Sequence, residues 1–248
     1  MFENLLNLMC LTHHIYALLL IYTKELTPRL KYILEFIFEE ILRTSFQVTS
    51  DEQVFQAGNQ PKINYSDQFF ENSFRIKPAG LLFEKEVVEQ ELYLPVWNNK
   101  RVMFLTDPKS EMPFDPFAAS FFMLSRYEEY LENEPDMHGR YDVYNCMGYN
   151  NDFINSPVVD LWIAELRERL VSKFPGLKID NKPYHYIPTI DVDEPYAFKY
   201  KGFKRIVGGF INAGSRNIQG EKRLRVKVFF GKEKDPYDTF NLIKDWHK

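Results

Sequence analysis

Cysteine is scarce in this sequence: the 248 residues include two, Cys10 and Cys146, and no Cys-x-x-Cys pair. Two cysteines cannot form the disulfide framework of a small secreted protein, so a reducing compartment is the simpler expectation. The first 22 residues lack a basic start and a small-residue cleavage site, which disfavours a signal peptide. The apolar stretch 5–22 is interrupted by polar residues and makes a poor membrane span. We therefore predict a cytoplasmic protein with no integral membrane segment.

An excess of positive charge is also missing, because 31 Lys and Arg stand against 35 Asp and Glu, giving a formal net charge of −4. This balance predicts no nucleic acid or other general polyanion as a partner. The charge is uneven, since residues 199–234 hold 11 Lys and Arg against 2 Asp and Glu. Such a basic run is more often a solvated face than a polyanion contact. The hydrophobic share of 45% and the aromatic share of 16% are ample for a packed core.

Hydrophobic periodicity predicts an α/β fold with a mixed sheet and flanking helices. A buried strand over 18–23, a helix over 29–43 behind a Thr27–Pro28 cap and a strand over 46–48 form a β-α-β opening. Further strands are predicted at 63–65, 81–83 and 102–105, and loops at 51–61 and 108–116. The strongest helical patterns cover 117–131 and 157–174; a last helix is predicted at 237–247, and 224–230 is either helix or strand.

The segment Asp136-Met-His138-Gly-Arg140 is a compact polar cluster after a proline. His138 and Asp136 are residue types that ligate metals or act as bases. A turn held by pairing of Asp136 with Arg140 explains the same residues without chemistry. We favour the turn, because no second cluster in the sequence completes a site.

A second acidic segment follows a short apolar stretch. Tyr186, Ile187 and Ile190 predict a buried strand, and Asp191 and Asp193 stand at its carboxyl end. Strand side chains alternate with period 2, so both carboxylates can lie on one face, at the end where α/β folds place ligands and catalytic groups. Together they could hold a divalent cation, or act as one ligand and one general base. A simple turn remains the alternative, because Asp and Pro also end strands.

Thr189-Ile-Asp191-Val-Asp193, followed by Tyr196-Ala-Phe-Lys, resembles the first metal-binding motif of the polysaccharide deacetylase (NodB-like, carbohydrate esterase) family. The preceding region is similar to the amino-terminal domain of a deacetylase subgroup, through Leu26-Thr-Pro-Arg-Leu-Lys-Tyr, Pro113-Phe-Asp-Pro-Phe-Ala-Ala-Ser-Phe-Phe, Leu124-Ser-Arg-Tyr-Glu-Glu-Tyr-Leu and His138-Gly-Arg140. The resemblance implies hydrolysis of N-acetyl groups on a glycan substrate, with a divalent metal, zinc, in the complete protein. It implies that Asp191 is the general base and Asp193 the metal ligand. The family's usual motif has adjacent Asp residues, and Val192 separates them here, so the reverse assignment stays open.

The resemblance also implies a division of the chain: residues 1–17 as an appendage, 18–183 as the amino-terminal α/β domain, and 184–248 as the truncated start of a NodB-like β/α barrel. The family's His-x-x-x-His pair is missing, because no two of the five histidines are four residues apart. A zinc site needs about three protein ligands, so one carboxylate cannot form it. We therefore expect the amino-terminal fragment of a deacetylase, inactive as given.

Two other functions fit parts of the sequence. A binding or scaffold module could position a glycan without chemistry. A glycosyltransferase could use Asp-x-Asp after a strand to hold a metal and a diphosphate. Against the glycosyltransferase, the sequence has no Gly-rich phosphate loop.

Overall fold

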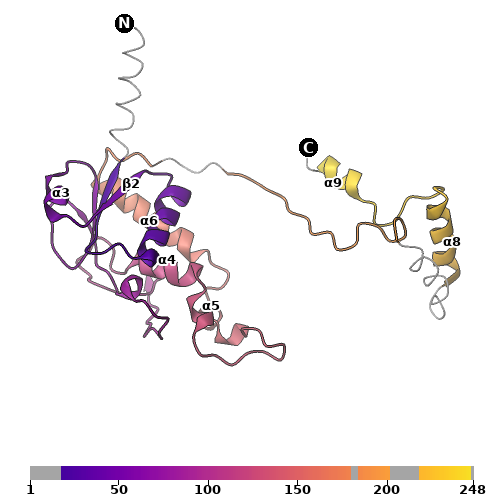
Figure 1. Ribbon diagram of the computed structural model, residues 1–248, viewed down its shortest axis with the longest axis horizontal. Coiled ribbons are helices and arrows are strands. Elements are labelled where there is room, and N and C mark those ends of the chain that lie inside the picture. Colours follow the sequence, from indigo (N-terminus) through magenta and orange to yellow (C-terminus); the bar gives the residue numbers. More distant parts are fainter. Residues whose placement is uncertain (1–17, 180–183, 202–217, 247–248) are drawn as a thin grey trace, which may run out of the picture. The chain divides into compact units, whose positions relative to one another are not determined.

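The computed structural model describes residues 18–179, 184–201 and 218–246, and its contacts divide the chain into two units, Met1–Pro183 and Tyr184–Lys248. The first unit is built on a four-stranded sheet in the order β2-β1-β3-β4 (Figure 1). Every neighbouring pair of strands is parallel, so the prediction of a mixed sheet is wrong. The strands are β1 (Leu19–Tyr22), β2 (Phe46–Thr49), β3 (Lys62–Tyr65) and β4 (Phe74–Ile76).

Helices cover both faces of this sheet. Helix α2 (Pro28–Glu35) and the π-helical turn η1 (Phe36–Ile41) connect β1 to β2, and α3 (Glu52–Ala57) connects β2 to β3. Ile21 of β1 packs in the main core with α2, whereas Tyr22 packs with Phe55 of α3. Figure 1 accordingly shows α3 on the other side of the strands from α4 and α6. The predicted β-α-β opening is confirmed, and the next crossover returns on the opposite face.

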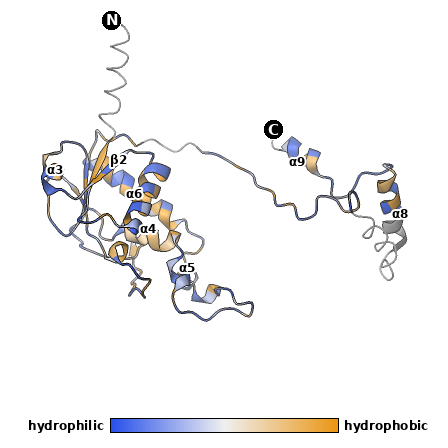
Figure 2. Ribbon diagram, viewed as in Figure 1, coloured by the Kyte–Doolittle hydropathy of each residue, from blue (hydrophilic) through white to orange (hydrophobic). Residues whose placement is uncertain are grey.

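The main core is closed by α4 (Pro116–Leu124) and α6 (Val158–Lys173), which pack against each other, while α4 also contacts α2. Helix α4 is coloured as largely hydrophobic in Figure 2, and six of its nine residues are buried. The helix predicted over 117–131 is too long, because α4 ends at Leu124. Arg126 adopts a left-handed backbone with φ 53°, a conformation that ends helices, and a separate 3-10 turn, η3 (Tyr127–Tyr130), follows.

Short elements fill the rest of the first unit, and two predicted strands are wrong. Residues 81–83 form a 3-10 turn, η2 (Leu81–Phe83), because Gly80 at φ 109° turns the chain and Phe83 N–H donates to Gly80 C=O. The strand predicted at 102–105 is replaced by a hairpin just before it, whose turn is made by Asn98 and Asn99, both at positive φ. The hairpin strands are β5 (Val96–Trp97) and β6 (Lys100–Arg101), and the remaining elements are η4 (Val143–Asn145) and α5 (Met147–Asn150).

Side-chain caps decide two helix starts. Thr27 caps α2 by accepting from Leu30 N–H at 3.1 Å, as the Thr27–Pro28 pair predicts. Asp51 likewise accepts from Gln53 N–H at 2.8 Å and starts α3. The predicted loop at 51–61 therefore contains a helix, which the buried side chain of Phe55 holds against the sheet.

The second unit contains α8 (Ile218–Phe229), α9 (Phe240–Trp246) and an irregular segment over residues 184–201. The buried strand predicted from Tyr186, Ile187 and Ile190 is wrong, because these three side chains are exposed on backbone without secondary structure. A strand needs a neighbour for its hydrogen bonds, and the described part of this unit has no second strand. The expected NodB-like barrel thus stays a prediction. None of the described helices is long and apolar enough to span a membrane.

Candidate functional site

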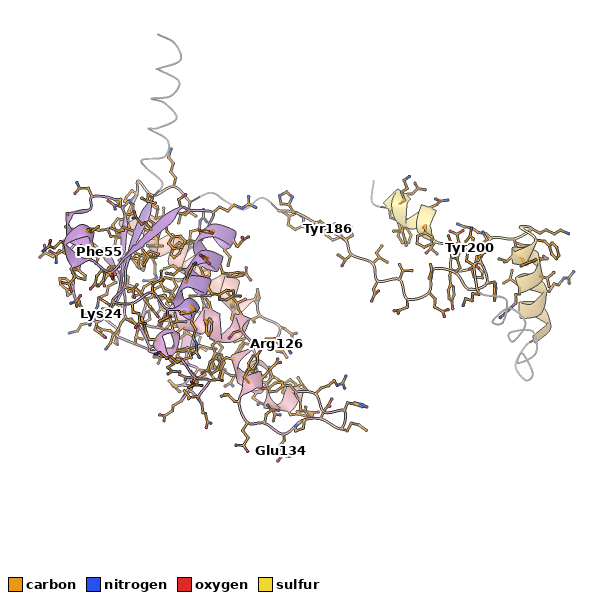
Figure 3. All side chains as sticks on the ribbon, viewed as in Figure 1. Lys24, Phe55, Arg126, Glu134, Tyr186 and Tyr200 are labelled. Carbon is orange, nitrogen blue, oxygen red and sulfur yellow. The ribbon has the colours of Figure 1, made fainter. Side chains whose placement is uncertain are left out.

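Asp191 and Asp193 lie on the irregular segment of the second unit, together with the exposed Tyr186 labelled in Figure 3. Both aspartates are exposed, and neither forms an ion pair or a hydrogen bond with any described residue. Within the described ranges there is also no group of three His, Cys, Asp or Glu side chains that could hold a metal ion. Their roles as base and metal ligand therefore stay predictions, and the carboxylates themselves are open to solvent.

Asp235 fixes the backbone that follows these aspartates. Its carboxylate accepts hydrogen bonds from the consecutive backbone N–H groups of Ala197, Phe198 and Lys199 at 2.8, 2.8 and 3.0 Å, and from Tyr237 N–H at 3.0 Å. Burial alone would raise the pKa of Asp235, but these donors outweigh it and lower the pKa to about 2. The last helix, predicted at 237–247, begins later, as α9 at Phe240.

Aromatic contacts join this turn to α8 and α9, the helices in the described part of the second unit. The Tyr196 ring lies 5.8 Å from the ring of Phe240 in α9 and 5.0 Å from that of Tyr200. The guanidinium of Arg225, in α8, lies 4.8 Å from the centre of the Phe198 ring, a cation–π contact. The aromatic residues after the Asp motif thus pack within this unit, and Asp235 holds their backbone.

The cluster around His138 is the turn that we favoured. Asp136 accepts from the backbone N–H groups of His138 and Arg140 at 2.8 and 2.9 Å, and its other oxygen accepts from the Arg140 guanidinium. The Arg140 backbone N–H and its guanidinium lower the pKa of Asp136 below the ordinary value. All hydrogen-bonding capacity of this carboxylate is directed at its own loop, which confirms the structural interpretation.

A buried carboxylate that the sequence analysis missed stands at the carboxyl end of β3. Asp115 accepts from Tyr65 O–H at 2.7 Å and from Ala79 N–H at 2.9 Å, and its second oxygen caps α4 through two further N–H groups. Burial raises the pKa of Asp115 against the effect of these donors, and burial with the nearby carboxylate raises that of Tyr65. The Asp115–Pro116 pair is a helix-start signal that could have located it.

A second cluster of polar side chains, formed by Tyr22, Glu52 and Gln68, lies where the order of the parallel strands reverses, between β1 and β3. Tyr22 O–H lies 3.2 Å from the Glu52 carboxylate and 3.1 Å from the Gln68 side-chain oxygen, and the Gln68 amide donates to Glu52 at 2.7 Å. Burial and the Glu52 carboxylate raise the pKa of Tyr22. Ligands of open α/β sheets bind at such a reversal. Here, however, the Glu52 carboxylate accepts hydrogen bonds from the neutral side chains of Tyr22 and Gln68. We therefore interpret this cluster as one that stabilises the fold.

A parallel sheet with helices on both faces places the first unit among the doubly wound α/β proteins. The chain belongs to the Family of unknown function (DUF7033), whose sequence model matches residues 19–175, more than half of the chain. No curated protein and no solved structure matches it. The family match includes Asp115 and the Asp136 turn, and it ends before Asp191 and Asp193.

Proposed function

We propose that this chain is the leading part of a metal-dependent polysaccharide deacetylase, in which Asp191 acts as the general base and Asp193 as a ligand of a divalent metal, zinc. The observation that carries the proposal is the Thr189–Asp193 motif with both carboxylates exposed and free of described partners. Such carboxylates can bind a cation without first breaking an ion pair. We further propose that the protein works in the reducing cytoplasm, in line with its two cysteines.

The donors fit a cation in kind and fall short in number. Carboxylate oxygens ligate zinc, but a catalytic zinc takes about three protein ligands. The remaining ligands would come from outside this chain, whose five histidines include no pair four residues apart. Zinc, when bound, polarises an acetamide carbonyl and lowers the pKa of its water. Asp191 would take the proton of that water, and the turn held by Asp235 would fix the backbone behind it.

The test compares this chain with a longer product that includes whatever sequence follows Lys248 in its gene. For the chain alone we expect no tight zinc binding by calorimetry and no acetate release from an N-acetylated chitin oligosaccharide. For the longer product we expect metal-dependent acetate release that Asp191→Asn and Asp193→Asn abolish and that the exposed control Asp67→Asn leaves intact. Full activity of the Asp193→Asn variant would overturn the assignment. Metal-dependent acetate release by the chain alone would show that this chain supplies enough metal ligands by itself.

A further inference from the structure

A cleft of about 880 Å³ opens in the first unit beside α5, a volume within the range of about 300–1,000 Å³ for small-ligand sites. One wall is the segment 87–92, and the other is the lobe of residues 128–150 that carries η3, η4 and α5. This lobe is marked by the label of Glu134 in Figure 3 and by the label of α5 in Figure 1. We call this site the α5 cleft; all of its lining residues belong to the first unit.

Aromatic rings form the exposed part of the α5 cleft. The side chains of Tyr130 and Tyr144 are 72% and 68% exposed, although both line the cleft. Tyr149 supports Tyr144 edge-on, with ring centres 5.5 Å apart. A tyrosine ring offers a flat apolar face with a polar hydroxyl at its end, and that combination suits ligands that are partly apolar and partly wet.

Amide side chains in the α5 cleft are oriented by the protein itself. The side-chain nitrogen of Asn133 donates to Leu131 C=O, that of Asn145 to Glu134 C=O, and that of Asn150 to Tyr144 C=O, at 2.7–2.9 Å. Each of these bonds uses one of the two N–H donors of its amide and fixes the direction of the side-chain oxygen, which remains as an acceptor. A ligand that brings hydrogen-bond donors can therefore bind to these oriented oxygens.

The charges in the α5 cleft have one sign. Glu89, Glu128 and Glu132 line it, and there is no Lys, Arg or His among the described residues that do so. Like charges repel, so the cleft disfavours phosphates, sulfates and acidic sugars and favours a cationic ligand. Burial and the carboxylates of Glu128 and Glu129 raise the pKa of Tyr141 to about 12, so its hydroxyl stays protonated.

The two walls of the α5 cleft are joined by hydrogen bonds. The buried Tyr127 accepts from Val88 N–H at 2.9 Å and donates to Val88 C=O at 3.1 Å, which ties the segment 87–92 to η3. Glu128 accepts from Met147 N–H at 2.9 Å and ties η3 to α5. A site with walls held in this way loses less entropy when a ligand binds.

We propose that the α5 cleft binds an oligosaccharide that carries free amino groups. Sugar rings present flat C–H faces to the tyrosines, their hydroxyls supply donors to the amide oxygens, and their ammonium groups pair with the glutamates. A lysine-rich peptide fits less well, because its ammonium groups can pair with the glutamates but its side chains bring no ring face for the tyrosines. The inference depends on residues of the first unit alone and does not require the proposed deacetylase chemistry.

The test measures binding of four probes to the full chain by calorimetry: a glucosamine hexamer, its N-acetylated form, a galacturonic acid hexamer and hexalysine. We expect the glucosamine hexamer to bind most tightly, with an affinity that falls as salt rises. Tyr130→Ala should raise its Kd about tenfold, and Glu132→Gln about threefold with a smaller salt dependence. Tyr184→Ala and Glu134→Gln are matched controls, since Tyr184 is 88% exposed in the second unit and Glu134 is exposed outside the cleft lining.

Several results would overturn the proposal: no binding of the glucosamine hexamer, equal binding of the acidic hexamer or of hexalysine, or equal effects of the cleft variants and their controls. Circular dichroism of each variant separates loss of binding from loss of fold. Asp191→Asn and Asp193→Asn should leave Kd unchanged, so failure of the α5 cleft and failure of the deacetylase proposal give different results.

Discussion

The buried Asp115 is the position where a one-atom change should reveal most about how the family's domain is held together. Asp115 joins three elements, because it caps α4, accepts from Tyr65 at the end of β3 and accepts from the Ala79 loop. Asp115→Asn keeps the size of the side chain and its cap to α4. It replaces the second oxygen with an NH₂ group that meets Ala79 N–H donor to donor, while the Tyr65 hydroxyl can rotate to accept.

The expected cost of Asp115→Asn follows from the one contact that it loses. A buried donor left without a partner costs about 1–3 kcal/mol, so we expect the free energy of unfolding to fall by that amount. Tyr65→Phe removes a hydrogen bond to a charged group and should cost about 1.5–3 kcal/mol. When Asp115→Asn is already present, the same Tyr65→Phe change should cost only about 1 kcal/mol, because the lost bond is then between neutral groups.

The measurement is urea unfolding of the four proteins of this double-mutant cycle, followed by the emission of the buried Trp162 and the partly buried Trp97, since Trp246 is exposed. Because the pKa of Asp115 is raised, the stability it provides is present at low pH and decreases as pH rises through its folded pKa. The gap between wild type and Asp115→Asn should therefore widen when pH is lowered from 7. Additive effects of the two substitutions, or a neutral Asp115→Asn, would show that the three elements do not depend on this carboxylate.

Two further predictions concern the second unit and the start of α2. Asp235, with its pKa lowered to about 2, stabilises its turn above the ordinary value of 3.8 and loses this effect as pH falls through about 2. The protection factors of the Ala197–Lys199 amides against hydrogen exchange, taken relative to the intrinsic rates at each pH, should therefore fall between these values. Unchanged protection factors at pH 2 would contradict this prediction. Thr27→Val removes a cap to Leu30 N–H and a donor to Leu82 C=O and should cost about 2 kcal/mol in urea unfolding. Thr106→Val is the matched control, because the Thr106 hydroxyl is buried with no hydrogen-bond partner among the described residues and should be replaceable at no cost.

Local patterns in the sequence were sufficient to predict several elements whose conformation depends on residues close together in the chain. The Thr27–Pro28 cap, the apolar run of β1 and the periodicity of α6 each carry their signal within a few residues, and each prediction is confirmed. The error at 117–131 falls where backbone conformation rather than hydrophobicity decides. Arg126 ends a helix at positive φ without a glycine, and the side chains around it continue the apolar pattern.

The candidate sites show the same division. The Asp136–Arg140 turn was predictable because its partners are four residues apart. Asp115 binds Tyr65 across 50 residues, so only its cap to α4 left a signal in the sequence. The α5 cleft could not have been anticipated, because its acceptor character depends on which way three asparagine amides are turned, and their backbone partners set that direction.

The two proposals concern different parts of the chain, and their chemistry is complementary. The α5 cleft lies inside the region that the family model matches, whereas Asp191 and Asp193 lie beyond it. Deacetylation turns a neutral acetamide into an amine that carries a positive charge when protonated. Glu89, Glu128 and Glu132 would attract that product more strongly than the acetylated substrate. If both proposals hold, the cleft would bind a glycan through the sugar units that have already lost their acetyl groups. Its affinity for the glycan should therefore rise as the degree of acetylation falls.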